Sequence, residues 1–226
     1  MKNILFVFLS VFSICAVYAQ EEPLRMCALE DFRRFEPGEY RYGQAPYEFT
    51  RRIEERDGKH ILCVGNTAEV LVGWRFNDVR QKNFIMRIRF RFLEENKFLN
   101  FTFHGGGGSL YHYFHYRFRL FPQKAFLLLD IRGSERKLNG TKQNPVPHVR
   151  NRDINPRLKV NEWIELEMWV RDESFAAYAV RPDGTKRELL KSPILPGSCI
   201  QPGIYFGGKA EVEWVKSYLL PEEDKK

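Results

Sequence analysis

One stretch of the chain alternates strictly between apolar residues and arginine, Met86-Arg87-Ile88-Arg89-Phe90-Arg91-Phe92, and residues 116–120 repeat the pattern. Successive side chains of a β-strand point to opposite faces, so each stretch would have one apolar and one cationic face. This pattern fits a strand that covers a hydrophobic core on one side and meets water on the other. The alternating pattern therefore predicts β-sheet structure, and by itself it does not identify a ligand.

The rest of the chain also reads as short strands separated by turn residues. Asp57-Gly58 is the strongest hairpin signal, and Pro182-Asp183-Gly184 predicts a second turn. Residues 162–171 alternate as cleanly as the arginine strand, and only residues 28–35 carry helical spacing. About a dozen strands, with no repeat and no alternating helices, predict an all-β fold, a two-sheet antiparallel β-sandwich of the jelly-roll type.

The N-terminus reads as a secretory signal peptide. Lys2 precedes an apolar run over residues 4–17, and Val17-Tyr18-Ala19 has small residues where a signal peptidase cleaves. This run is too short for a transmembrane segment, and no later stretch approaches about 20 apolar residues. We expect a signal peptide over 1–19, one β-sandwich domain over 20–220 and a charged flexible tail over 221–226.

Export limits the kinds of partner that the positive charge can serve. The whole chain has a formal net charge of +7, which becomes about +6 when Lys2 is removed with the signal. A protein that is secreted, extracellular or periplasmic seldom meets nucleic acid, so no nucleic acid is expected among its partners. Carbohydrates, acidic glycans among them, envelope surfaces and other proteins are the partners that remain.

Three cysteines follow the expected cleavage site, and an odd number leaves at least one thiol without an intramolecular partner. Cys27–Cys63 is the first candidate for a disulfide because both residues lie in the N-terminal third. Cys27–Cys199 is the alternative if the termini meet. Three free thiols are the third outcome, because a core of this size does not need a disulfide.

Three segments resemble the concanavalin A-like lectin and glucanase superfamily. They are the opening Glu30-Asp31-Phe32, the strand 160–166 with its following hairpin, and the closing pair Gly203–Gly207 and Ala210–Val215. The closing pair is also similar to 3-keto-disaccharide hydrolase and laminin-G-like domains. The resemblance implies a jelly roll and a carbohydrate ligand. A structural calcium ion is common among such relatives, but the resemblance assigns no ligands for it here and implies no other cofactor.

The catalytic candidates are Glu165 and Glu167, which share one strand face with two tryptophans. Retaining glycoside hydrolysis needs two carboxyl groups about 5–5.5 Å apart, which alternate residues of one strand can supply. The central aspartate of the glucanase motif is missing, so whether the protein is an enzyme stays open. A polysaccharide lyase would use Tyr113, His115 and Arg117 instead.

Arginine binds carboxylated and sulfated sugars through its planar fork, which suggests a binding site on the arginine faces. The alternative is that these arginines pair with acids across the sheet and need no ligand. We expect a secreted, non-catalytic glycan-binding protein, with a hydrolase or lyase and a protein-interaction domain as alternatives. Arg87, Arg89, His115, Arg117, Glu165, Glu167 and Trp169 are the predicted ligand-binding residues, and no metal ligand is predicted.

Overall fold

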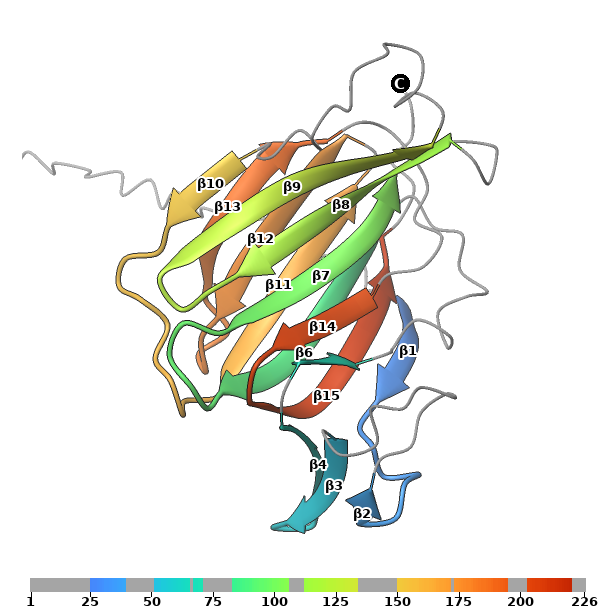
Figure 1. The fold of residues 1–226 in the computed structure, drawn as a ribbon, viewed down its shortest axis with the longest axis vertical. Helices are drawn as coiled ribbons and strands as arrows, with labels where there is room; N and C mark the ends of the chain where they lie inside the picture. Colours follow the sequence, from blue (N-terminus) through green and yellow to red (C-terminus); the bar gives the residue numbers. More distant parts are fainter. Residues whose placement is uncertain are drawn as a thin grey trace, which may run out of the picture.

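The strands form two antiparallel sheets packed face to face (Figure 1). The computed structural model describes residues 25–39, 51–65, 67–70, 83–105, 112–133, 150–171, 173–194 and 203–220. Within these ranges, nine strands make the larger sheet and six make the smaller one, and no helix occurs. The predicted all-β fold class, a two-sheet antiparallel jelly-roll sandwich, is confirmed.

Sheet A, the larger sheet, is built around β15 (Ala210–Leu219). One edge of β15 pairs with β6 (Phe84–Phe92), and the other edge pairs with β4 (Lys59–Val64) and β1 (Arg25–Glu30). Beyond β6 and β4 the sheet continues to its two ends through β11 (Ile164–Arg171), β12 (Ser174–Val180) and β13 (Lys186–Pro193) on one side, and β3 (Arg51–Arg56) and β2 (Gly38–Glu39) on the other.

Sheet B, the smaller sheet, lies in front of sheet A in Figure 1, with β7, β8 and β9 as its long strands. Its strands in spatial order are β10 (Arg150–Asp153), β9 (Lys124–Gly133), β8 (His112–Leu120), β7 (Phe98–Gly105), β14 (Gly203–Gly207) and β5 (Thr67–Val70). The two arginine-rich stretches therefore belong to different layers, because residues 86–92 lie in β6 and residues 116–120 lie in β8.

The core is made of the apolar side chains that alternate inward from both sheets. On β6 the buried residues Met86, Ile88, Phe90 and Phe92 alternate with half-buried arginines, as the sequence predicts. Aromatic rings join the layers: the ring centroid of Phe175 on β12 lies 5.1 Å from those of both Phe103 and Phe118 on sheet B. Such ring pairs add to the free energy gained from burying apolar surface.

Both predicted turns are present. Asp57 and Gly58 connect β3 to β4 with φ angles of 53° and 69°, which is the left-handed pair that a tight two-residue hairpin requires. At the second turn the amide of Gly184 donates to the carbonyl of Arg181 at 2.9 Å, and β12 pairs with β13 on either side of it.

The helical expectation for residues 28–35 is wrong. Residues up to Glu30 belong to β1, which pairs with β15, and the chain then turns at Phe32, whose φ is 62°. The buried carboxylate of Glu30 accepts a hydrogen bond from the Phe32 amide at 3.0 Å, and Phe32 enters the core. Pairing with a distant strand thus outweighs a local spacing that fits a helix.

The predicted signal peptide and tail lie outside the described residues, and the single-domain assignment stays a prediction. Among the residues that the structure describes, no helix has the length and apolar character needed to span a membrane.

Candidate functional site

The predicted ligand-binding residues do not form one site. Arg87 and Arg89 on β6 share the outer face of sheet A with the β11 residues that were predicted with them, namely Glu165, Glu167 and Trp169. His115 and Arg117 lie on β8, in the other sheet. Since each outer face points away from the core, the two groups are on opposite sides of the sandwich. The structure therefore does not bring the seven predicted ligand-binding residues together.

On sheet A, each arginine of the alternating stretch has its own carboxylate partner. Arg87 pairs with Glu167, the Nε of Arg89 donates to Glu213 at 2.7 Å, and the Nε of Arg91 donates to Glu211 at 2.6 Å. Two of these acids come from β15 and one from β11, which are the two strands that flank β6. The arginines of this face are therefore paired across the sheet.

Glu167 is fully buried and contacts three donors. Its carboxylate pairs with Arg87, accepts a hydrogen bond from the indole Nε1 of Trp169, and lies 2.7 Å from the Nζ of Lys186. A carboxylate held in this way has no free face for a substrate. Glu165 lies half-buried at the register position opposite Arg89. Because only one of the two predicted catalytic carboxylates is accessible, the geometry does not favour a retaining hydrolase at this pair.

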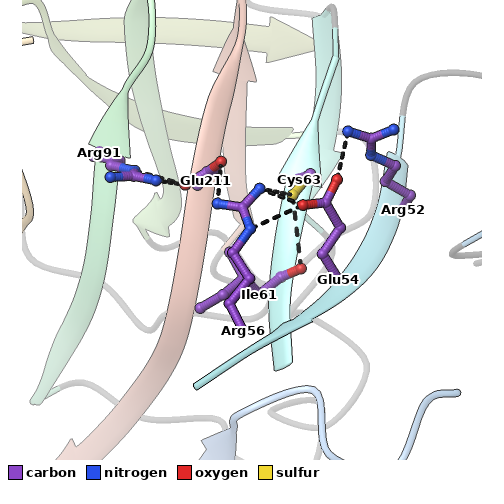
Figure 2. Close-up of polar contacts among 7 residues, drawn as sticks. All are labelled: Arg52, Glu54, Arg56, Ile61, Cys63, Arg91 and Glu211. Carbon is purple, nitrogen blue, oxygen red and sulfur yellow. Dashed lines mark hydrogen bonds and ion pairs between the residues drawn. The ribbon is translucent and has the colours of Figure 1, made fainter. Parts of the chain in front are cut away.

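A chain of ion pairs extends across β6, β15, β4 and β3, as Figure 2 shows. Glu211 accepts hydrogen bonds from Arg91 and from Arg56, the latter at 2.8 Å, and Glu54 pairs with both Arg56 and Arg52. The hydrogen bond from Arg56 lowers the pKa of Glu54 below its ordinary value. Alternating signs along the chain stabilise the sheet edge without any ligand.

Cys63 lies within this ion-pair chain and is a free thiol (Figure 2). Burial, together with the smaller effect of the nearby carboxylates of Glu54 and Glu211, raises its pKa to about 11. The predicted Cys27–Cys63 disulfide is wrong. β1 and β4 pair with different parts of β15, so the backbones of these two residues lie roughly six strand positions apart, about 20 Å, whereas a disulfide spans less than about 7 Å between Cα atoms.

The tryptophans of sheet A are covered by cations of the same face. The guanidinium carbons of Arg91 and Arg89 lie 4.9 Å and 5.6 Å from the Trp163 ring centroid, and Lys186 and Arg171 lie 5.1 Å and 5.3 Å from that of Trp169. These contacts stabilise the cations on the outer face of sheet A.

The outer face of sheet B is built differently. Register pairs place Phe126, Arg119, Asn100 and Tyr205 side by side across β9, β8, β7 and β14. The next row places Leu128 beside Arg117 and Thr102. The row after that brings His115 opposite His104, in the backbone register only, since the side chains of both lie outside what the structure describes.

Four half-exposed aromatic side chains lie together at one end of this face. The Phe98 ring stacks on Tyr205 with 6.2 Å between centroids and meets Phe121 at 5.5 Å, and Phe121 meets Phe126 at 5.9 Å. The Nζ of Lys124 lies 5.2 Å from the Phe126 centroid. We call these four rings the aromatic cluster of sheet B. The cluster provides half-exposed, flat apolar surface on this face.

Arg119 borders the aromatic cluster. Its Nε donates to the Oδ1 of buried Asn100 at 2.8 Å, and its guanidinium carbon lies 4.6 Å from the Phe98 centroid. Burial lowers the pKa of Arg119, and the cation of Arg117 lowers it further. Among the described residues, no carboxylate forms an ion pair with Arg119, in contrast with the arginines of β6.

Sequence reasoning missed the residues that build this second face. Alternation did place Phe98, Asn100 and Thr102 on the face opposite to buried Leu99 and Phe101, and the structure confirms that division. The sequence does contain one signal for this face: the polar Asn100 lies on a strand rich in phenylalanine, and Arg119 lies on the following strand, with which it pairs.

Metal ligation has no candidate in the described part of the chain. No group of three or more His, Cys, Asp or Glu residues gathers there in a way that could hold an ion. The calcium ion that the resemblance suggests has no assigned ligands.

No family model and no curated protein matches the chain. Solved structures match at low identity. The fourth domain of an extracellular arabinanase from Geobacillus stearothermophilus, solved with arabinotriose, is 11% identical, with 88% of this chain and 94% of that chain covered and a TM-score of 0.48. A protein of unknown function from Shewanella oneidensis is 10% identical, covering 77% and 76% with a TM-score of 0.45. Sheep galectin-11 is also 10% identical, covering 68% and 98% with a TM-score of 0.42.

Proposed function

We propose that this chain is an exported, non-catalytic protein that binds a carbohydrate on the outer face of sheet B. The observation that supports this most directly is the aromatic cluster of sheet B, four half-exposed rings on a face that also presents polar groups. Sugar rings have apolar faces and polar edges, so a binding surface needs flat apolar area beside hydrogen-bonding groups.

Thr102 and Arg119 supply those groups next to the cluster. Their strands are central in sheet B, since β7 and β8 each have neighbours on both sides. A site on central strands is held more rigidly than a site on loops, which lowers the entropy cost of binding. The export part of the proposal rests on the predicted signal peptide over residues 1–19.

The proposal moves the site away from Glu165, Glu167 and Trp169. A hydrolase at that pair gains no support, because the Glu167 carboxylate is covered by its own three donors. Trp169 donates to the same carboxylate and is covered by cations.

The test is a screen of the purified protein against immobilised neutral and acidic glycans, followed by calorimetric titration with the best oligosaccharide. Phe126→Ala removes one ring of the cluster and is expected to weaken binding at least tenfold. Trp163→Ala is the matched control, since it removes a half-exposed aromatic ring from the outer face of sheet A and is expected to leave binding unchanged.

Thermal unfolding of each variant shows whether the fold is retained, and Tyr205→Ala provides a second test if Phe126→Ala does not fold. Absence of binding to every glycan class would contradict the proposal. Loss of binding in Trp163→Ala, with Phe126→Ala unaffected, would move the site back to sheet A.

A further inference from the structure

Arg119 is held in a fixed position by its neighbours on sheet B. Asn100 accepts the Nε hydrogen bond at 2.8 Å and is itself buried, with 7% of its surface exposed. Phe98 lies under the guanidinium, and the Phe98 ring is in turn packed over the backbone of Gly207, where a Cβ atom would overlap it. The plane of the guanidinium is therefore supported on one side and along one edge before any ligand arrives.

The Nε hydrogen bond leaves the other edge of the guanidinium, with its two terminal nitrogens, for a further partner. Within the described part of the chain, those two nitrogens have no hydrogen bond or ion pair. Arginine presents this end-on fork to carboxylate and sulfate groups in a bidentate arrangement that lysine cannot reproduce.

The charge of Arg119 is also not balanced locally. Its neighbour Arg117 carries the same charge, and burial makes the charged state more costly than in water. In the backbone register, Glu69 lies three strands from Arg119, and Asp130 lies on the neighbouring strand, four residues beyond the position opposite Arg119. Those spacings put their backbones roughly 14 Å from that of Arg119, which is too far for an arginine and a carboxylate to form a direct ion pair.

We propose that the carbohydrate bound on sheet B is acidic, carrying a carboxylate or sulfate, and that Arg119 contacts this group through its two terminal nitrogens. This inference rests on the proposed function. An anion on the fork would supply the opposite charge that the β6 arginines obtain from glutamates, while the aromatic cluster would contact the sugar ring that bears the anion. Asn100 and Phe98 act as positioning residues for Arg119.

The test compares matched acidic and neutral ligands by calorimetric titration. Oligogalacturonate and its carboxyl-reduced counterpart differ only at the carboxylate. A κ-carrageenan oligosaccharide, whose only acidic groups are sulfates, and its neutral desulfated form test a sulfate in the same way. We expect at least one acidic member to bind tenfold or more tightly than its neutral counterpart. We also expect that affinity to fall steeply between 50 mM and 500 mM salt, since salt screens the charges.

Three variants assign the preference to Arg119. Arg119→Met is expected to reduce affinity for the acidic ligand by tenfold or more and to leave affinity for the neutral counterpart within twofold. Arg119→Lys keeps the charge without the fork and is expected to bind with intermediate affinity. Arg187→Met is the matched control: burial lowers the pKa of Arg187 too, but this residue donates to the carbonyl of Pro156 at 2.6 Å and lies in sheet A, so no change is expected.

Failure of this inference is distinct from failure of the proposed function. If the protein binds neutral and acidic members equally and Phe126→Ala abolishes both, the glycan-binding proposal stands and the acidic preference is wrong. If an acidic preference exists but Arg119→Met retains it, the assignment to Arg119 is wrong. If neither member of any pair binds, the proposed function itself is wrong.

Discussion

Both outer faces of the sandwich carry arginines on strands with the same alternating pattern, but the two faces differ in whether these arginines have carboxylate partners. On sheet A, Arg87, Arg89 and Arg91 each meet a glutamate from a flanking strand. On sheet B, Arg119 meets an amide, an aromatic ring and another arginine. The alternation is the same in both sheets, and the difference lies in the strands that flank it.

The comparison separates stabilisation from recognition. A face whose charges are paired internally gains stability from them and has little to offer a charged ligand. A face that keeps a cation without a counter-ion accepts a cost in stability, and such costs are typical of binding sites. This difference supports our proposal that sheet A stabilises the fold and that sheet B carries the binding site.

The largest expected effect is on sheet A, at Glu167. Glu167→Gln leaves Arg87 and Lys186 beside a buried neutral amide, so we expect the free energy of unfolding to fall by about 3 kcal/mol, as is typical when one member of a buried ion pair is removed. Urea denaturation monitored by tryptophan fluorescence measures the change.

Two matched variants sharpen this result. Glu165→Gln alters a half-buried carboxylate on the same strand face and should cost less than about 1 kcal/mol. Arg119→Met on sheet B should also cost less than about 1 kcal/mol, since loss of the Asn100 hydrogen bond is offset by removal of a poorly compensated charge. Equal costs for Glu167→Gln and Arg119→Met would remove the distinction between the two faces.

The next effect is on sheet B, at Gly207. Gly207→Ala places a methyl group where the Phe98 ring lies, so the ring must move, and we expect a loss of about 2 kcal/mol, as is typical of overpacking. Because Phe98 supports Arg119, affinity for an acidic ligand should fall as well. Unfolding and titration measurements on the same sample test both expectations.

A double-variant cycle identifies the cause. In a Phe98→Ala background the added methyl group has no ring to meet, so the cost of Gly207→Ala should largely disappear. If the cost is the same in both backgrounds, the ring contact is not what selects glycine at this position.

The smallest expected effect concerns pH and sheet A. Burial would raise the pKa of Glu213, but the hydrogen bonds from Lys59 and Arg89 outweigh it, so the pKa lies below its ordinary value of 4.5. A carboxylate with a lowered pKa stabilises the folded state above the unfolded-state pKa, and this contribution is lost as the pH falls through the lowered value. Glu213→Gln should therefore cost about 1 kcal/mol at pH 7 and progressively less as the pH falls through the lowered pKa.

Denaturant midpoints at several pH values compare the parent protein with Glu213→Gln. The gap between them should close as the pH falls. A gap that stays constant from pH 7 to pH 3 would show that Glu213 acts through its shape and not through its charge.

The sequence predicts the fold far better than it predicts the site. Alternation assigns each strand an inner and an outer face, as the buried and half-buried residues of β6 show, and Asp57-Gly58 specifies its own turn. The helical spacing of residues 28–35 was misleading, because the pairing of β1 with β15 is decided by residues almost 190 positions away.

The site required information that local patterns do not contain. Alternation shows that Arg89 and Arg117 both point outward, but it does not show that their strands belong to different sheets. Nor does it show that Gly207 and Phe98 are register partners, and that contact positions the ring beneath Arg119. Pairing between distant strands decides both matters.

The central place of β15 has a consequence for how the protein folds. The β6 residue closest to it in sequence, Phe92, pairs with Ala210, which lies 118 positions further along the chain. β4 and β1 also pair with β15, so neither can complete its pairing before β15 is present. Until residue 219 has been synthesised, three strands have unpaired edges, and contacts of such long range form slowly. A chain released without its last strand is therefore expected to aggregate through these three unpaired edges.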